Sequence, residues 1–437
     1  MEALLGDEYP AFLSCYERSA YRGIRRNPLK CDEETLQKAL PFPLVNTHFS
    51  PLSYYAPAET KLGGFAAHHA GMFYAQEPSA ASAVTLLDPK PGEKILDLCA
   101  APGGKTTQIA SLTGDTGLLV ANEIVRSRAS VLASNLERMG VRNAVVTSCR
   151  PDMLEKNFTG YFDKILVDAP CSGEGMFRHD PTAVAEWTPE TPVACAARQA
   201  EILDSAAQML RPGGMMVYST CTFSAAENEG SMDAFLERHP EFEAMAVDVS
   251  FGRPAWNGHA VRIWPMDGGE GHFAALLRRK EDSTIDSSSE SKLPQIERNL
   301  LTEATALWKV CFTSEPDGIF YHPKQSDTIY AVPKELPSFD GIPVVRFGYE
   351  FSKIVGSRLE PCHGAFLCRK AGDCRSIVDY DADDPILAAY LRGEEIPCDP
   401  SLKGYTAVSV CGVPLGFGKA SGGRLKNKYP KGLRNHK

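Results

Sequence analysis

The sequence predicts an α/β protein whose central domain is a doubly wound, mostly parallel sheet. Apolar runs alternate with amphipathic stretches between Lys94 and Arg279, and this alternation is typical of strand–helix–strand units. The chain has 437 residues, which is too long for one hydrophobic core and indicates about two to four domains. We therefore expect an α+β extension before this sheet and small β-rich domains after it.

The expected elements of the central domain follow one another along the chain. Each strand is a short apolar run, and polar periodic segments that are long enough for helices separate the strands. The strands are Lys94–Cys99, Gly117–Asn122, Ala144–Thr147, Lys164–Asp168, Met215–Ser219 and Phe273–Leu277. The clearest helices are Arg126–Met139, Ala196–Leu210 and Ala226–Arg238. Parallel strands connected in this way bring the residues that follow them to one edge of the sheet.

We expect five segments along the chain. Residues 1–85 combine a helix-like start with an irregular part rich in proline, glycine and aromatic residues. The central domain, residues 86–280, is followed by a polar, serine-rich linker at residues 281–294, where no hydrophobic period indicates structure. Residues 295–375 contain short β-like runs that predict a first C-terminal domain, and residues 383–437 form a second small unit.

Charge limits the classes of function. The formal net charge is −9, so the protein as a whole is not a basic nucleic-acid binder. The C-terminal segment is different, because its charged residues are all basic: Lys419, Arg424, Lys426, Lys428, Lys431, Arg434 and Lys437. This basic segment is either a surface that contacts a polyanion or a disordered, solubilising tail.

The cysteines and the N-terminus favour a cytoplasmic protein. An odd number of cysteines, 13, is scattered along the chain, which is typical of reduced thiols. The acidic N-terminus has no long apolar core and does not read as a secretory signal, and no run is apolar enough to span a membrane. We expect no metal site, because the spacing of Cys362, His363, Cys368 and Cys374 matches no zinc pattern.

The first expected strand ends in a glycine-rich turn, DLCAAPGGKT, which begins at Asp97. Gly103 and Gly104 let a ligand approach the backbone, and the helix that follows favours a polar or anionic group at its start. A phosphate loop does not fit, because the position that it reserves for glycine is Cys99. Glu123, after the next strand, suits hydrogen bonding to ribose hydroxyls, although an acid is also favoured at a helix start.

Two cysteines follow two strands of the predicted sheet. Cys171 stands in DAPCSG, which begins at Asp168, and Cys221 stands in STCT. An isolated cysteine is more often a small buried hydrophobe, and an aspartate in this place often caps a turn. Two thiols at corresponding strand ends, where open α/β sheets bind ligands, instead indicate covalent chemistry in which one thiol attacks and the other assists.

Together these motifs resemble the Nop/Sun-type family of S-adenosylmethionine-dependent RNA cytosine-C5 methyltransferases. The resemblance covers Phe65–Leu277 through YAQEPS, DLCAAPGGKT, DAPCSGEGMFR and STCTFSAAENE, and it implies a Rossmann-like methyltransferase sheet. The C-terminal GVPLGFGK and RLKNKYPKGLR are similar to the PUA-like end of bacterial 16S ribosomal RNA methyltransferases of the RsmF type. The segment RRNPLK at Arg25 is similar to that family's N-terminal RNA-contacting segment.

The resemblance implies roles for individual residues. Cys221 matches the nucleophile, Cys171 the thiol that helps to release the product, and Asp168 the acid that hydrogen-bonds the cytosine; Lys105 matches the motif lysine near these groups. The expected site for S-adenosylmethionine consists of Cys99, Ala100, Ala101, Pro102, Gly103, Gly104, Lys105, Glu123, Arg128 and Asp168. Many relatives carry an acid in the loop after the third strand, but this chain reads TSCRPD at residues 147–152 and departs from that pattern.

The chemistry of cytosine gives independent support for this assignment. C5 of cytosine is a poor nucleophile, but adding a thiolate to C6, with N3 protonated or hydrogen-bonded, turns C5 into an enamine carbon that attacks a methyl sulfonium. A paired base must first leave its stack. We therefore expect a monomeric, cytoplasmic enzyme that methylates C5 of cytosine in 16S ribosomal RNA through a Cys221–C6 bond. The alternatives are a transfer RNA substrate and a ribosome-assembly factor without catalysis.

Overall fold

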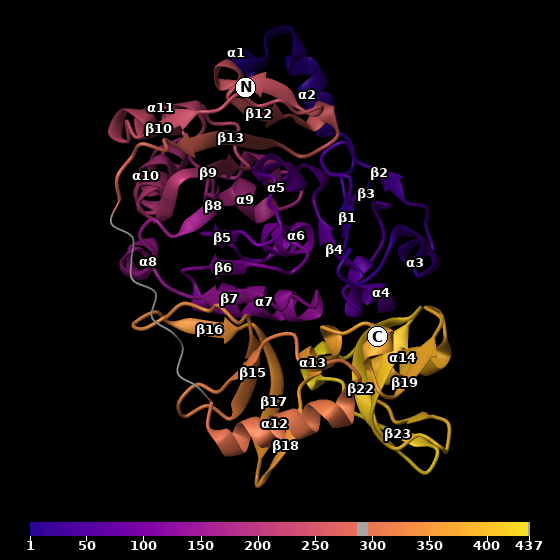
Figure 1. Cartoon of the computed structure of the whole chain (residues 1–437). Helices are drawn as coiled ribbons and strands as arrows, with labels where there is room; N and C mark the ends of the chain where they lie inside the picture. Colours follow the sequence, from indigo (N-terminus) through magenta and orange to yellow (C-terminus); the bar gives the residue numbers. More distant parts are fainter. Residues whose placement is uncertain (286–295, 436–437) are drawn as a thin grey trace.

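The structure is a computed structural model that describes residues 1–285 and 296–435. Most of the predicted linker, residues 286–294, lies outside the described residues. Figure 1 shows the N-terminal extension at the top and along the right side of the central sheet, and the two C-terminal units together at the bottom of the view. Within the described part of the chain, no helix is long and apolar enough to cross a membrane.

A mixed sheet of ten strands forms the centre of the protein (Figure 1). Its strands are β5 (Lys94–Asp97), β6 (Leu118–Asn122), β7 (Ala144–Thr147), β8 (Phe162–Asp168), β9 (Leu210–Thr220), β10 (Phe242–Ala244), β11 (Arg253–Ala255), β12 (Ala260–Ile263), β13 (His272–Arg279) and β16 (Val344–Phe347). They lie in the order β11-β12-β13-β9-β8-β5-β6-β7-β16, with β10 beside β13. Strands β5 to β9 run parallel to one another, and each of the other strands is antiparallel to the strands with which it pairs. This arrangement confirms the predicted α/β fold.

Helices cover both faces of the parallel strands. They are α5 (Ser82–Leu87), α6 (Gly104–Leu112), α7 (Arg126–Arg138), α8 (Pro151–Phe158), α9 (Pro181–Glu186), α10 (Thr191–Met209) and α11 (Glu229–Arg238). In β8, Ile165 and Val167 pack into one hydrophobic core, while Leu166 between them packs into another. Successive side chains of a strand point to opposite faces, so both faces of β8 are buried at Ile165–Val167, and this run is continuously apolar for that reason.

The order of the strands reverses between β5 and β8. From β5 the chain continues to β6 and β7 on one side, and it then returns to β8 and β9 on the other side. Open α/β sheets bind ligands outside the carboxyl ends of their strands at such a reversal. The antiparallel strand β13 pairs with β9, with Phe273 opposite Thr220, so His272 at the start of β13 lies at the same edge.

The N-terminal extension contains a four-stranded sheet in the order β2-β3-β1-β4. Its elements are α1 (Glu2–Leu5), α2 (Tyr9–Cys15), β1 (Gly23–Arg26), α3 (Glu33–Lys38), β2 (Val45–Asn46), β3 (Ser53–Tyr55), α4 (Ala66–His69) and β4 (Phe73–Gln76). Arg25 and Asn27 of the segment RRNPLK are buried. Asn27 Nδ2 donates to the carbonyl oxygens of Gly71 and Met139 at 2.9 and 2.8 Å. These two side chains bind the protein itself, and RNA contact by the extension stays a prediction.

The first C-terminal unit is attached to the central sheet. It contains α12 (Arg298–Cys311), β14 (Ile319–Tyr321), β15 (Thr328–Val332), β17 (Tyr349–Val355), β18 (Arg358–Pro361) and α13 (His363–Leu367), and its sheet has the order β14-β15-β17-β18. Strand β16 lies between β15 and β17 in sequence, but it pairs with β7 as the outer strand of the central sheet. The segment from 296 to 375 therefore contributes a strand to the central sheet.

The last unit is a five-stranded sheet in the order β19-β21-β22-β23-β20. Its elements are β19 (Ile377–Tyr380), α14 (Pro385–Arg392), β20 (Ile396–Pro397), β21 (Gly404–Val410), β22 (Val413–Ser421) and β23 (Arg424–Asn427). Strand β19 precedes the predicted start of this unit at residue 383 and pairs in parallel with β21.

Much of the basic segment belongs to this sheet. Lys419 lies in β22, Lys426 lies in β23, and the aromatic ring of Tyr429 is buried against His69 and His363. The alternative of a disordered tail is therefore wrong for the described part of the segment, which ends at residue 435. Lys437 lies outside the described residues, and contact of the segment with RNA stays a prediction.

Candidate active site

The two cysteines predicted to act together lie side by side at the carboxyl ends of β8 and β9. These strands are parallel and place Asp168 opposite Ser219, so the loops that follow them begin at the same level. The sulfur atoms of Cys171 and Cys221 lie 3.3 Å apart, and the backbone N–H of Cys221 donates to the Cys171 sulfur at 3.4 Å. The hydrogen bond with Cys221, followed by burial, raises the pKa of the Cys171 thiol.

A charged pair lies beside the thiols. Lys105 Nζ lies 2.8 Å from Asp168 Oδ2, and Ser219 Oγ donates to Asp168 Oδ1 at 2.7 Å. Burial opposes the charge of the Asp168 carboxyl, but Lys105, followed by His272 and Ser219, lowers its pKa below the usual value. Burial likewise opposes the charge of Lys105, yet Asp168 raises the pKa of the lysine. The site therefore holds a carboxylate and an ammonium in direct contact.

A histidine that sequence reasoning did not include faces this pair. His272 Nε2 lies 3.9 Å from Asp168 Oδ1 and is buried without a hydrogen-bond partner. Burial, followed by the charge of Lys105, lowers the pKa of His272 to about 3, so its imidazole is neutral near neutral pH. A single histidine before an apolar run does not by itself indicate a functional role. Its place at this edge follows only from the pairing of β13 with β9.

The glycine-rich turn after β5 lies at the same edge of the sheet. Gly103 has φ = 110°, in the left-handed region that favours glycine, and a Cβ there would lie 3.0 Å from the side chain of Leu132. Helix α7 holds the turn through Arg128 Nη2, which donates to the carbonyl oxygen of Ala101 at 3.1 Å, and Asn135 Nδ2, which donates to that of Pro102 at 2.9 Å. The turn therefore keeps a fixed backbone shape beside Lys105.

Two buried carboxyl groups lie beside this turn. Asp97 ends β5, and its Oδ2 accepts from Thr106 Oγ1 at 2.7 Å, while its Oδ1 is buried without a partner. Burial raises the pKa of Asp97 to about 7. Glu123 follows β6 and is 4% exposed, so it is not a solvated residue at a helix start. Its Oε1 accepts from the backbone N–H of Val125 at 2.9 Å, and Arg128 lies 3.2 Å from its Oε2.

The loop after β7 is tied to this region by Asn122. Asn122 Nδ2 donates to the carbonyl oxygen of Cys149 at 3.0 Å, and Thr147 Oγ1 donates to Asn122 Oδ1 at 2.9 Å. Asp152, which lies slightly beyond the place where relatives carry an acid, pairs with Arg150 at 2.9 Å. The sequence predicts a role for Glu123 but none for its neighbour Asn122, because the asparagine contacts a loop that is distant in sequence.

Three family models match the chain. The model described as 16S rRNA methyltransferase RsmB/F matches residues 84–278, the N-terminal domain of 16S rRNA methyltransferase RsmF matches residues 1–78, and the methyltransferase RsmF PUA domain matches residues 378–435. Ribosomal RNA small subunit methyltransferase F from Shewanella amazonensis is 31% identical over an alignment of 466 positions, gaps included, that covers 98% of this chain and 96% of that protein. The chain belongs to the ribosomal RNA small subunit methyltransferase F family.

Other members of this family and solved structures agree with that assignment. Ribosomal RNA small subunit methyltransferase F from Aliivibrio fischeri is 31% identical over an alignment of 447 positions, gaps included, that covers 97% of this chain and 93% of that protein. A methyltransferase homologue from Pyrococcus horikoshii has a TM-score of 0.56 at 29% identity, over 63% of this chain and 91% of the other. NSun6 from Pyrococcus horikoshii, solved with SFG, has a TM-score of 0.58 at 23% identity, over 64% and 97%, which shows a shared fold.

This family member is an S-adenosylmethionine-dependent RNA methyltransferase, and the resemblance seen in the motifs is confirmed. The residues at the strand ends fit a cationic methyl donor, because buried carboxyl groups surround the turn and Asp97 Oδ1 lacks a partner. S-adenosylmethionine supplies an electrophilic methyl group on a sulfonium. Glu123 and Arg128 lie beside the turn from Cys99 to Lys105, and the contact that each makes with the donor stays a prediction.

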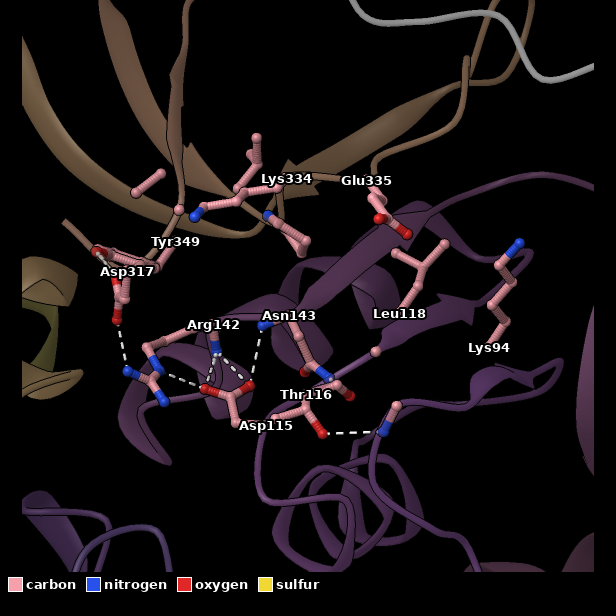
Figure 2. Close-up of a pocket in the computed structure, with 16 residues that line it drawn as sticks. Lys94, Asp115, Thr116, Leu118, Arg142, Asn143, Asp317, Lys334, Glu335 and Tyr349 are labelled. Atoms are coloured by element: carbon pink, nitrogen blue, oxygen red, sulfur yellow. Dashed lines mark hydrogen bonds and ion pairs between the residues drawn. The ribbon is translucent and has the colours of Figure 1, made fainter.

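The cavity in Figure 2 lies at the opposite edge of the sheet. It has a volume of about 400 Å³ and lies between the beginnings of β5 and β6 and the first C-terminal unit. Arg142 crosses this junction, with Asp115 at 2.6 Å and Asp317 on its other side (Figure 2). Since Lys94 and Leu118 begin their strands here and the thiols follow strand ends, this cavity is not the active site.

The remaining cysteines form neither disulfides nor metal clusters in the described part of the chain. All 13 cysteines are free thiols. Among the described residues, no group of three or more His, Cys, Asp or Glu side chains is placed to hold a metal ion. Cys362 and Cys374 are buried, and burial raises the pKa of both thiols.

Proposed function

We propose that the enzyme transfers a methyl group from S-adenosylmethionine to C5 of a cytosine in 16S ribosomal RNA, through a covalent bond between Cys221 and C6. The observation that carries this proposal is the contact of the Cys171 and Cys221 sulfur atoms at 3.3 Å, next to the Lys105–Asp168 pair. The names of the curated relatives support ribosomal RNA of the small subunit as the substrate.

The charged pair suits the attack on C6. The ammonium of Lys105 interacts with the Cys221 sulfur as well as with Asp168, and a nearby cation stabilises negative charge on an attacking sulfur. Because the pKa of Asp168 is held low, Asp168 enters the reaction as a carboxylate. It then stabilises a cytosine protonated at N3 by accepting a hydrogen bond from it, and the protonated ring accepts the thiolate at C6.

The two thiols suit different steps. Adding Cys221 to C6 makes C5 an enamine carbon, which takes the methyl group. A base then takes the C5 proton, which restores the C5–C6 double bond and expels the Cys221 thiolate. The raised pKa of Cys171 favours a thiol that keeps its proton during the attack, as expected of the group that assists release. The target cytosine must be unpaired or flipped out to reach these sulfurs.

Bisulfite sequencing of ribosomal and transfer RNA from a deletion strain tests the proposal. We expect one or more cytosines of 16S ribosomal RNA to lose their methyl group, and the wild-type gene to restore it. The Cys221→Ala variant should restore nothing, although it should still bind the donor. Loss of methylation in transfer RNA alone would support the alternative substrate. Unchanged methylation in both RNAs would favour an assembly factor without catalysis.

We further propose that the enzyme acts as a monomer in the cytoplasm, with RNA as its partner. The match of residues 378–435 to a PUA domain supports an additional contact with RNA outside the active site. The exposed part of the basic segment is the surface that suits this contact, because phosphate groups attract lysine and arginine side chains.

A further inference from the structure

The residues that directly follow the two cysteines meet in a buried polar cluster. Ser172 follows Cys171 and Thr222 follows Cys221, and their hydroxyl oxygens lie 2.9 Å apart. Both residues are buried, with exposures of 8% and 1%. This contact joins the two loops that carry the thiols at a position adjacent to each sulfur.

Glu227 binds both loops from one side. Its Oε1 accepts from the Ser172 hydroxyl and lies 3.3 Å from Thr222 Oγ1. Its Oε2 accepts from the backbone N–H of Ser172 at 3.0 Å and from Gln199 Nε2 at 2.9 Å. Gln199 Nε2 also donates to the carbonyl oxygen of Pro170 at 3.0 Å. Glu227 and Gln199 are both completely buried, so these bonds are shielded from water and hold the loop before and after Cys171.

Glu174 binds the same two hydroxyls from the other side. Its Oε2 lies 2.8 Å from Ser172 Oγ and accepts from the hydroxyl of Thr222. Its Oε1 accepts from Trp187 Nε1 at 2.9 Å, which fixes the direction of the carboxyl group. The next residue, Gly175, donates its backbone N–H to the carbonyl oxygen of Cys221 at 2.8 Å. The segment that carries Glu174 is therefore also fastened to the loop of the nucleophile.

The contacts in this cluster require more protons than the hydroxyls supply. Ser172 Oγ contacts Glu227, Glu174 and Thr222, and Thr222 Oγ1 contacts Glu174 as well, all within hydrogen-bond distance. Two hydroxyls provide only two protons for these contacts, and oxygen atoms this close repel each other without a proton between them. Burial raises the pKa of Glu227, the charge of Glu174 adds to this rise, and the hydrogen bonds to Ser172 and Gln199 oppose it. The raised pKa is consistent with a third proton on Glu227.

We infer that Ser172, Thr222, Glu174 and Glu227 form a clamp that positions the Cys171 and Cys221 thiols against each other for release of the product. For the roles of the two thiols, this inference rests on the proposed function. None of the four side chains touches the reacting atoms, so they are positioning residues. A displacement of reacting groups by about 1 Å can cost about 100-fold in rate, and the clamp holds both loops at the residue next to each sulfur.

The distance between the sulfurs can be tested without RNA or methyl donor. In buffers of reduced and oxidised glutathione, the two thiols lose two protons and two electrons to glutathione disulfide, forming a Cys171–Cys221 disulfide and two molecules of glutathione. The equilibrium constant of this exchange reports the effective concentration of one thiol at the other. Thr222→Val keeps the shape of the side chain and removes its hydroxyl. We expect this variant to lower the constant at least 10-fold, measured by mass spectrometry of the linked peptides.

Thr220→Val is the matched control. Thr220 flanks Cys221 on its other side and is also completely buried. Its hydroxyl donates to Asn228 Oδ1 at 2.6 Å and accepts from the backbone N–H of Thr222 at the long distance of 3.5 Å, so it contacts none of the four clamp side chains. We expect the control to keep the wild-type constant. An unchanged constant in Thr222→Val, or an equal fall in both variants, would overturn the inference. A higher constant in Thr222→Val would overturn it too, because the clamp would then hold the sulfurs apart.

Single-turnover kinetics on RNA test the consequence for release. In Thr222→Val and Ser172→Ala we expect release of the Cys221–RNA adduct to slow more than its formation, so that the adduct accumulates on denaturing gels. Glu227→Gln should restore release relative to Glu227→Ala, because an amide keeps one acceptor for Ser172 N–H and Gln199 and presents N–H groups to the hydroxyls, as a protonated carboxyl does. Equal defects in both Glu227 variants would refute the third proton.

The two experiments separate this inference from the proposed function. If the wild-type enzyme forms no adduct with RNA, the proposed covalent mechanism fails, while the glutathione equilibrium still reports on the clamp. If the adduct forms and resolves normally in every clamp variant, the mechanism stands and the clamp has no role in release.

Discussion

Arg25 of the N-terminal extension donates from Nη2 to the carbonyl oxygen of Gly104 at 2.9 Å, inside the glycine-rich turn of the central domain. The same nitrogen donates to Thr107 Oγ1 at 2.6 Å, and the side chain is 1% exposed. Burial lowers the pKa of Arg25 to about 9, because removing the charged guanidinium from water costs free energy. The extension therefore helps to shape the turn expected to hold the methyl donor.

The first prediction concerns this contact. Arg25→Met should destabilise the protein by about 1–3 kcal/mol, because it leaves buried carbonyl and hydroxyl groups with one partner fewer. It should also weaken the affinity for S-adenosylmethionine, measured by calorimetry on the folded variant. Arg22→Met is a suitable control, since Arg22 Nη1 donates to the carbonyl oxygen of Ala58 at 2.8 Å, away from the turn. Wild-type donor affinity in a folded Arg25→Met variant would show that the extension does not shape the donor site.

The second prediction separates the roles of the two thiols. In Cys171→Ser, Cys221 can still attack C6, but the adduct should resolve slowly and accumulate as a protein–RNA species on denaturing gels. The species should vanish when Cys221→Ala is added, because the attacking thiol is then missing. An adduct that survives in Cys221→Ala and disappears in Cys171→Ser would reverse the assignment of nucleophile and assisting thiol.

The third prediction concerns Glu123. Because its buried carboxylate faces the edge where the donor is expected, Glu123→Ala should weaken donor affinity by about 1–3 kcal/mol, the typical cost of losing hydrogen bonds to a charged group. Glu123 also accepts from Val125 N–H and pairs with Arg128. The variant must therefore be shown to keep the wild-type structure at the start of α7. Arg128→Met removes the ion pair and leaves the carboxylate in place, and a smaller loss in this variant would assign the effect to Glu123. Equal donor affinity in wild type and Glu123→Ala would exclude a ribose contact.

The strands of the parallel sheet could be predicted because both of their faces are buried, which gives continuous apolar runs such as Ile165–Val167. Strand β16 could not be assigned to this sheet. Its partner β7 is about 200 residues earlier in the chain, and a short β-like run does not indicate which sheet it joins. Strand β9 begins at Leu210, earlier than the predicted Met215, because its first residues include Pro and Gly, which read as a turn.

The candidate site, like the sheet, could be predicted from the sequence only in part. Cys171, Cys221 and Asp168 could be predicted because strand ends at one edge of a parallel sheet must be neighbours. Arg25 and His272 could not be predicted in the same way, since both reach the edge through tertiary packing that no local pattern encodes. Ser172 and Glu227 lie within the recognised motifs, but their meaning depends on the meeting of two loops.

The fourth prediction concerns pH and three histidines where the N-terminal extension meets the C-terminal units: His363 is buried, and His68 and His69 are half-buried. His69 Nδ1 lies 2.7 Å from the Tyr429 hydroxyl, and the ring of His363 packs against the same tyrosine. Burial lowers the pKa of His69 to about 4 and those of His68 and His363 to about 3. All three imidazoles are therefore neutral in the folded protein at neutral pH.

The sign of the effect follows from the lowered pKa values. Below pH 6.5, the usual pKa of histidine, the unfolded chain binds protons that the folded protein does not. The stability that these histidines contribute is complete above pH 6.5 and is lost as the pH falls toward about 4, by up to about 1.4 kcal/mol per pH unit for each histidine. Urea unfolding at pH 7.5, 6.0 and 5.0 measures this loss. His363→Met should show a shallower fall than the wild type, and parallel curves for the two proteins would rule out His363 as a contributor.

The last prediction concerns the basic segment and RNA. Two of its cations have partners inside the protein: Arg424 lies 2.8 Å from Glu395, and Lys428 lies 3.2 Å from Glu360. Lys419, Lys426 and Lys431 are exposed. Removal of everything after Leu415 is a poor test, since it would delete most of β22 and all of β23 and unfold the sheet.

Substitution of the three exposed lysines by glutamine keeps the sheet and removes the charge. If they bind phosphate groups, the triple variant should bind RNA more weakly, and the slope of log affinity against log salt should fall by about one for each phosphate group that is no longer neutralised. A matched variant that replaces the exposed Lys309, Lys324 and Lys334 of the first C-terminal unit by glutamine has the same net charge, so it separates a local effect from a general electrostatic one. Equal salt slopes in the two variants would show that the basic segment is no special part of the RNA surface. Donor affinity should be unchanged in both, because the expected donor site lies in the central domain, beside Lys105 and Asp168.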